Sequence, residues 1–188
     1  MRVPLLCLAL VLFAGANAAA GELVVNGGFE TGDFTGWTVS GADTPGWDYG
    51  ISTNQPQSGT YSAWFGSPSG LTYLSQEIPT TPGQEYEISF WGAINNQGQP
   101  PDNEIQFYWN GIELLNGIDV PGRNWTFVET RVYATQDQTE AEFAFMNVPG
   151  WFAIDNVGAY AVPEPATLAL GGAALALLAI GRRRARKA

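Results

Sequence analysis

The sequence predicts an all-β domain, an antiparallel two-sheet β-sandwich of the jelly-roll kind. Residues 21–162 contain no long run of apolar residues at helical spacing, and Gly and Pro recur throughout. Short runs of alternating apolar and polar residues, typical of half-buried strands, dominate instead. Turn residues separate these runs at intervals of about 8 to 12 residues, which is the spacing found in sandwiches and jelly rolls.

Two alternating runs, at residues 86–91 and 105–109, give the clearest strand signals. The second run meets Asn110-Gly111, the strongest short hairpin signal, and a further strand is expected directly after it at residues 112–115. The remaining strands are expected at residues 23–26, 37–40, 47–52, 61–66, 71–78, 125–134, 141–148 and 151–161.

Residues 1–20 have the order of a cleavable secretory signal peptide. They begin with Arg2, continue through an apolar run and end in Ala16-Asn17-Ala18-Ala19-Ala20. The apolar run is too short for a permanent anchor, which needs about 20 residues. Because Cys7, the only cysteine, lies inside this run, the exported chain is expected to fold without disulfides.

The charge of residues 21–162 and the absence of His exclude several classes of function. This stretch holds 17 of the 18 acidic residues but only two basic ones, Arg123 and Arg131, so its net charge is -15. Such a surface repels phosphate backbones, which excludes nucleic acid as a partner. The chain has no His, and therefore no Ser/His/Asp triad, no Cys/His pair and no His-ligated zinc.

The C-terminus predicts a membrane-directed segment. Pro163-Glu164-Pro165 precedes an apolar stretch at residues 166–181 and a basic tail at residues 182–188. The positive-inside rule places that tail in the cytoplasm and the preceding domain outside. The stretch is shorter than the usual ~20 residues, but snorkelling Arg side chains extend its reach. It lacks the polar face of a buried amphipathic helix, so we expect a transmembrane helix at about residues 166–181.

These three features, in this order, resemble the PEP-CTERM sorting signal of bacteria. The resemblance implies recognition by an exosortase, an integral-membrane protease, and cleavage near Pro163-Glu164-Pro165. It also implies a route: export through the inner membrane, anchoring by the C-terminal helix, and delivery to the cell surface or extracellular matrix.

All seven Trp, all seven Tyr and nine of the ten Phe fall within residues 21–162. Most of these rings are expected to pack in the core, because a disulfide-free sandwich needs large buried side chains. An exposed minority on a sheet face would suit sugar binding, since aromatic rings can stack on the apolar face of a pyranose.

Four landmarks in this region resemble those of galactose-binding-like jelly rolls and related carbohydrate-binding modules. They are residues 23–30 with Gly36-Trp37, residues 58–63, residues 74–78 with Pro82-Gly83, and residues 152–157. In such modules the acids matching Glu30 and Asp155 hold a structural calcium ion, which takes hard oxygen ligands. Asp33 lies near Glu30 as a weaker candidate. The alternative is that these acids are ordinary solvated or capping residues.

Strand alternation predicts a ligand-binding face. If the apolar residues of their strands point inward, the outward set includes the ligand candidates Trp91, Gln106, Tyr108, Glu129 and Arg131. The two aromatic residues would then stack on a sugar while the other three bond its hydroxyl groups. A shift of one residue in any strand inverts this assignment. The alternative is an ordinary solvated sheet face, with Arg131 paired to a neighbouring acid.

Three functions are compatible with these features. The first is an exported, surface-sorted, noncatalytic protein that binds or organises extracellular polysaccharide. The second is a structural surface or matrix protein without specific glycan recognition. The third is a small glycoside hydrolase or lyase, which would use two carboxylates. No constellation in the sequence resembles a catalytic site, and a sandwich of about 140 residues has few loops to build a closed cleft.

Overall fold

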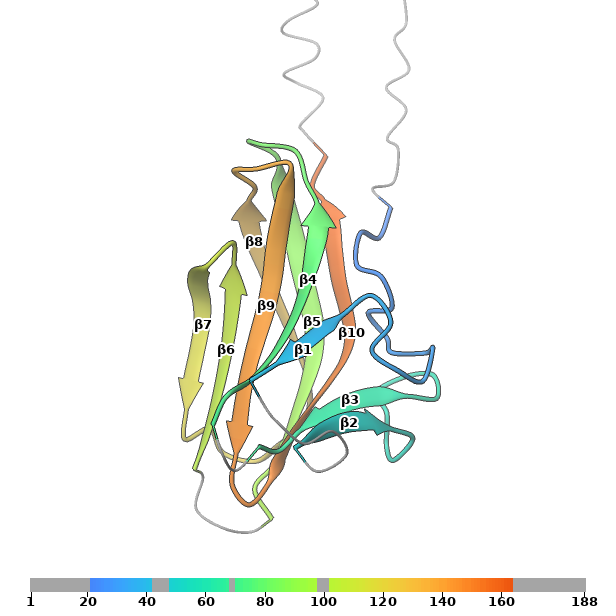
Figure 1. The fold of residues 1–188 in the computed structure, drawn as a ribbon, viewed down its shortest axis with the longest axis vertical. Helices are drawn as coiled ribbons and strands as arrows, with labels where there is room; N and C mark the ends of the chain where they lie inside the picture. The colour runs from blue at the N-terminus through green and yellow to red at the C-terminus, as the bar shows by residue number, and fades with distance from the viewer. Residues whose placement is uncertain (1–20, 42–47, 68–69, 98–101, 164–188) are drawn as a thin grey trace, which may run out of the picture. The chain divides into compact units, whose positions relative to one another are not determined.

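Residues 21–162 form one compact unit, and the computed structural model describes residues 21–41, 48–67, 70–97 and 102–163. All regular elements in these ranges are strands, arranged as two antiparallel sheets that face each other (Figure 1). The predicted all-β two-sheet sandwich is confirmed. The predicted signal peptide and C-terminal helix lie outside the described residues. Within those residues no helix is long and apolar enough to cross a membrane.

Each sheet has five strands. The first sheet has the order β1-β4-β9-β6-β7 and the second the order β2-β3-β10-β5-β8. The strands of the first sheet are β1 (Thr38–Ser40), β4 (Thr72–Pro79), β9 (Gln138–Asn147), β6 (Asn103–Trp109) and β7 (Ile112–Ile118). Those of the second are β2 (Tyr49–Ser52), β3 (Ser62–Phe65), β10 (Trp151–Ala161), β5 (Glu85–Asn95) and β8 (Arg123–Tyr133).

The β6–β7 hairpin forms where the Asn-Gly pair predicts it. Asn110 and Gly111 have positive φ angles of 51° and 73°, the backbone conformation that tight hairpin turns require. Trp109 pairs directly with Ile112 across the turn. One extra residue then enters β7 as a β-bulge before the pair Phe107–Leu115.

The core between the sheets is largely aromatic. Phe145 of β9 stacks on Phe65 of β3, with ring centroids 4.4 Å apart, and Phe143 meets Phe90 of β5 edge-on at 5.1 Å. These contacts join the first sheet to the second. Aliphatic residues fill the remaining space, in accordance with the alternation of their strands. The largest fully buried hydrophobic side chains are those of Phe29, Phe65, Phe107, Phe143, Phe145, Phe152, Leu74, Ile78, Ile88 and Ile154.

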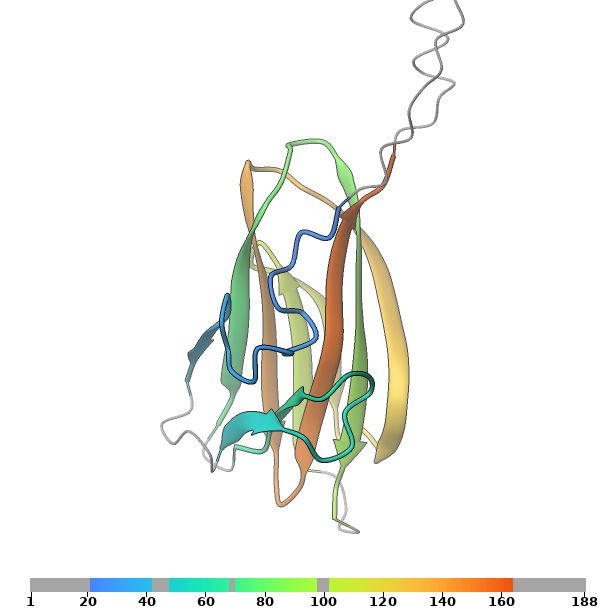
Figure 2. The same cartoon turned by 90° about the vertical axis from the view of Figure 1, so that its right-hand side faces the viewer.

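The prediction of a strand at residues 23–26 is wrong. This segment runs along the side of the sandwich between β4 and β10 (Figure 2) and bonds to both sheets instead of extending one of them. The amide of Leu23 donates to the carbonyl of Ala159 on β10, whereas Val25 exchanges two hydrogen bonds with the side-chain amide of Gln76 on β4. The apolar residues that suggest a strand therefore serve to close one side of the core.

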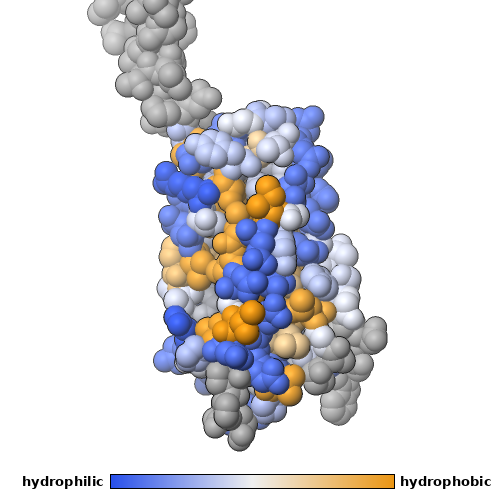
Figure 3. Space-filling model, turned by 90° about the vertical axis from the view of Figure 1, so that its left-hand side faces the viewer, coloured by the Kyte–Doolittle hydropathy of each residue, from blue (hydrophilic) through white to orange (hydrophobic). Residues whose placement is uncertain are grey.

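On the opposite side lie the edge strands β7 and β8, which carry exposed apolar side chains. Ile112, Leu114 and Ile118 on β7 and Phe127 on β8 are all at least 42% exposed. Figure 3 views this side and shows hydrophobic groups separated by hydrophilic ones. Some large apolar side chains on this side of the sandwich therefore lie outside the core, exposed to solvent.

We predict that Phe145→Ala lowers the free energy of unfolding of residues 21–162 by about 3–5 kcal/mol, because the ring is buried between both sheets. Denaturant titration of the purified segment measures this. Ile118→Ala is the control, because the side chain is 66% exposed and a surface change of this kind alters stability by about 0.5 kcal/mol or less. Equal losses in the two variants would contradict the proposed role of the aromatic core.

Candidate functional site

Small residues beside Trp64 leave a hollow on the outer face of the second sheet. Gly50, Trp64, Ala153 and Ala93 are direct cross-strand neighbours on β2, β3, β10 and β5. A Cβ atom at Gly50 would lie only 2.9 Å from Nε1 of Trp64, so glycine is needed for the indole to approach β2. The single large side chain of the row is thus flanked by residues that leave open space beside it.

This hollow widens into a groove of about 990 Å³ that crosses all five strands of the second sheet. Three partly exposed indoles, those of Trp64, Trp125 and Trp151, are among the lining side chains. One extra residue in β8, between Arg123 and Thr126, forms a bulge against β5. Because a bulge redirects side chains, Arg123 and its neighbours at residues 121–125 all reach the groove.

The loop between β2 and β3 supports one wall of the groove. Nε1 of Trp125 donates to the backbone carbonyl of Gln55 in that loop at 3.1 Å. Two residues further on, the amides of Gln57 and Ser58 donate to Oδ2 of Asp155 on β10. Asp155 is fully buried beneath this loop. A buried carboxylate on β10 therefore fixes the loop to which the indole is bonded.

Glu30 holds the continuation of the same loop. Its carboxylate accepts hydrogen bonds from the amides of Thr60 and Tyr61 at 2.9 and 3.0 Å. Glu30 and Asp155 lie close together, because a Cβ at Gly28 would be 3.7 Å from Cγ of Glu30 and 3.8 Å from Oδ1 of Asp155. The two residues with which the sequence predicts calcium binding thus both adjoin Gly28.

Backbone amides already bind part of each carboxylate, and the two carboxylates carry like charges. Burial raises the pKa of Asp155, and the negative charge of Glu30 adds to the effect. A divalent ion would offset both, and the donors are the hard oxygens that calcium takes. No cluster of three or more Asp, Glu, His or Cys residues occurs in the described ranges, so backbone or amide oxygens would have to complete the shell.

Asp33 belongs to a separate turn. Its Oδ1 accepts hydrogen bonds from Oγ1 of Thr31 at 2.7 Å and from the amide of Thr35 at 2.9 Å. The pKa of the Asp33 carboxyl is lowered most by a hydrogen bond from the Thr35 side chain, then by that from the Thr31 side chain, and least of the three by that from the Thr35 amide. The carboxylate of Asp33 therefore stabilises its own loop.

The five residues predicted to bind a ligand do not form one surface. Trp91, Glu129 and Arg131 lie on the outer face of the second sheet. There the ring centroids of Trp91 and Phe127 are 5.4 Å apart. Arg131 forms an ion pair with Glu87 at 3.2 Å, which is the neighbouring-acid alternative considered above. These three residues lie on the same sheet face as the groove but are not among its lining residues.

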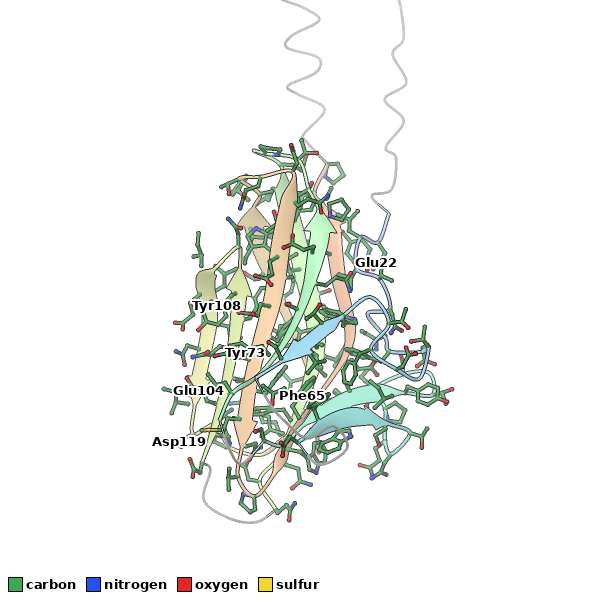
Figure 4. All side chains as sticks on the ribbon, viewed as in Figure 1. Glu22, Phe65, Tyr73, Glu104, Tyr108 and Asp119 are labelled. Carbon is green, nitrogen blue, oxygen red and sulfur yellow. The ribbon has the colours of Figure 1, made fainter. Side chains whose placement is uncertain are left out.

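Tyr108 lies on β6, on the outer face of the first sheet (Figure 4). Gln106 lies two residues earlier on the same strand and therefore shares that face, whereas Phe107 between them is buried in the core. Because the outer faces of a sandwich point in opposite directions, they cannot share a site with the other three. The hydroxyl of Tyr108 donates to Oε1 of Gln106 at 2.8 Å, and the Gln106 amide bonds to Glu104. Desolvation and the nearby charge of Glu113 raise the pKa of Tyr108. The side-chain amide of Gln106 thus already has partners on this face.

Trp64, Trp125 and Trp151 were not among the binding residues that the sequence pattern predicts. Their strands carried a usable signal, because Trp64 and Trp151 each directly precede an inward-pointing Phe. The cross-strand neighbours Gly50 and Ala153 could not be read from any single strand. The hollow depends on the register between four strands.

Comparison with known families assigns the end of the chain. Residues 161–187 match the family model described as the PEP-CTERM protein-sorting motif, as the resemblance predicts. The match includes the sorting residues Pro163, Glu164 and Pro165, of which the last two lie outside the described residues. A search of curated proteins found no match to the chain.

Solved structures share the fold of the sandwich. TmCBM61, solved with β-1,4-galactotriose, gives a TM-score of 0.59 at 20% identity, covering 76% of this chain and 100% of that domain. The CBM22-1 xylan-binding domain of Paenibacillus barcinonensis Xyn10C gives 0.53 at 15% identity, covering 78% and 98%. A cyclase from Fischerella sp. TAU gives 0.53 at 17% identity, covering 78% and 100%.

At these identities the likeness concerns the fold alone, because one fold hosts many functions. The structural neighbours include carbohydrate-binding modules of two families, CBM61 and CBM22. The chain thus joins a PEP-CTERM sorting motif to a β-sandwich of the kind found in carbohydrate-binding modules.

Proposed function

We propose that this chain is an exported, surface-sorted, noncatalytic protein that binds extracellular polysaccharide in the groove of its second sheet. An exosortase-type protease would process it at the C-terminal motif, after the C-terminal helix has held it in the membrane. The observation that carries the proposal is the groove lined by Trp64, Trp125 and Trp151. Its volume is at the upper end of the ~300–1,000 Å³ found for small-ligand sites, which gives room for an oligosaccharide.

The polar lining of the groove suits binding more than bond cleavage. It consists of hydroxyl groups, side-chain amides such as those of Asn54, Asn95 and Asn124, and the guanidinium of Arg123. Such groups bond sugar hydroxyls while indoles stack on the rings. Hydrolysis of a glycosidic bond uses a pair of carboxylic acids, which this lining does not supply among its described residues.

A structural surface or matrix protein without glycan recognition is the alternative. The exposed apolar residues Ile112, Leu114 and Ile118 on the edge strand β7 favour it, because such residues can mediate association between proteins. A saturable glycan-binding curve with a defined affinity separates the two functions.

We predict that Trp64→Ala weakens glycan binding about 30-fold, because loss of a central aromatic anchor costs about 2 kcal/mol or more. Calorimetry on residues 21–162 measures the affinity, with a panel that includes β-1,4-galactotriose, xylan and the exopolysaccharide of the host. Tyr108→Ala on the other sheet is the matched control and is expected to bind as the wild type does. If the control loses binding and Trp64→Ala keeps it, the site lies on the first sheet. Absence of binding to any glycan would favour the structural alternative.

We further propose that calcium stabilises the domain at Glu30 and Asp155. The proximity of these two carboxylates, one of them fully buried, supports the site. There the ion would supply charge compensation and would reinforce the loop that carries the Trp125 contact.

Chelation is therefore expected to lower the melting temperature of residues 21–162. Binding contributes about 2.7 kcal/mol when free calcium is 100-fold above its Kd. Asp155→Asn should abolish the difference between melting curves with calcium and with chelator, whereas the control Asp33→Asn should retain it. Identical wild-type curves in both conditions would exclude the calcium site.

For sorting, we predict that the triple change Pro163→Ala, Glu164→Ala and Pro165→Ala leaves the protein in the inner membrane, because it removes the matched motif. Membrane fractionation and protease access to intact cells report the location. The Trp64→Ala variant is the control, which should lose glycan binding and still reach the surface. Normal surface delivery of the triple variant would contradict processing at this motif.

A further inference from the structure

The groove differs in charge from the domain that contains it. Residues 21–162 hold 17 acidic and two basic residues. Among the described residues that line the groove there is no Asp or Glu, and one of the two basic residues, Arg123, is present. The described lining residues of the groove thus carry one positive charge and no negative charge, although the domain is strongly acidic. The composition of the groove therefore does not follow from the composition of the domain.

Arg123 is also chemically available. It is exposed at the start of β8, and no ion pair or hydrogen bond engages its guanidinium in the described part of the chain. Arg131, eight residues further along the same strand, is paired with Glu87 at 3.2 Å. Within the described residues the two arginines therefore differ, since Arg131 is ion-paired and Arg123 is not.

Because no carboxylate of the described residues pairs with the Arg123 guanidinium, it is suited to bind the carboxylate of a ligand. Arg binds carboxylates through two parallel hydrogen bonds in a planar arrangement. Acidic residues outside the groove oppose an anionic ligand, but their effect is screened over about 8 Å at physiological ionic strength. Inside the groove the direct contact with Arg123 therefore determines the sign of the interaction.

We propose that the groove selects an acidic polysaccharide, one whose sugars carry carboxylates as hexuronic acids do. The carboxylate pairs with Arg123, and the rings of the same and adjacent sugars stack on Trp125 and the neighbouring indoles. This inference rests on the proposed glycan-binding function and adds the class of sugar.

The test compares polymers that differ only in the carboxylate. Polygalacturonate, alginate and glucuronan are each measured against their carboxyl-reduced forms, with residues 21–162 whose cooperative melting has been verified. We expect the wild type to bind at least one acidic polymer about tenfold tighter than its reduced form. Arg123→Gln should reduce that ratio to about one, and Arg123→Lys should restore part of it. Arg131→Gln, the matched control, should leave the ratio unchanged.

Each other result overturns a defined part of the argument. If no acidic polymer binds better than its reduced form, while neutral glycans bind and Trp64→Ala abolishes that binding, the acidic class is wrong and the glycan-binding function stands. If the preference persists in Arg123→Gln, selection does not reside at Arg123. If no acidic, reduced or neutral polymer binds, both the class and the function fail.

Discussion

The contact between the aromatic side chains of the two sheets is the interaction on which the rest of the structure depends. Phe145 and Phe143 project from β9 and meet Phe65 of β3 and Phe90 of β5. The exported domain has no cysteine, so no disulfide can join its sheets. Large buried rings supply the cohesion instead, and they also fix which faces point outward. Since Phe65 points inward, its neighbour Trp64 must point to the solvent.

The groove follows from this arrangement in two steps. Register places Gly50 and Ala153 beside Trp64, and Ala93 beside Ala153, and so removes side-chain volume from the outer face. Asp155, on the same strand as Ala153, then secures the loop that bears on Trp125. The carboxylate of Asp155 is costly to bury, and three backbone amides compensate for much of that cost.

Local signals in the sequence predicted most of the fold, whereas the site depended on information that a single strand does not carry. Alternation and Asn110-Gly111 depend only on neighbours in the chain, so the β6–β7 hairpin was predicted correctly. Residues 23–26 have the pattern of a strand, but tertiary contacts to both sheets override it. Alternation places Trp91 and Tyr108 outward without stating in which sheet. Sheet order, which pairs strands distant in sequence, decided that they lie on opposite faces.

One strand connects the groove with the sorting motif. β10 begins at Trp151, in the groove, and ends at Ala161, where the matched motif starts. At about 3.3 Å per residue these ends are roughly 30 Å apart. β10 is the central strand of its sheet, flanked by β3 and β5. If the groove holds a polymer while the chain is attached through its C-terminus, tension between the two acts along β10. The hydrogen bonds of both flanking ladders would share that load in shear, instead of opening one after another.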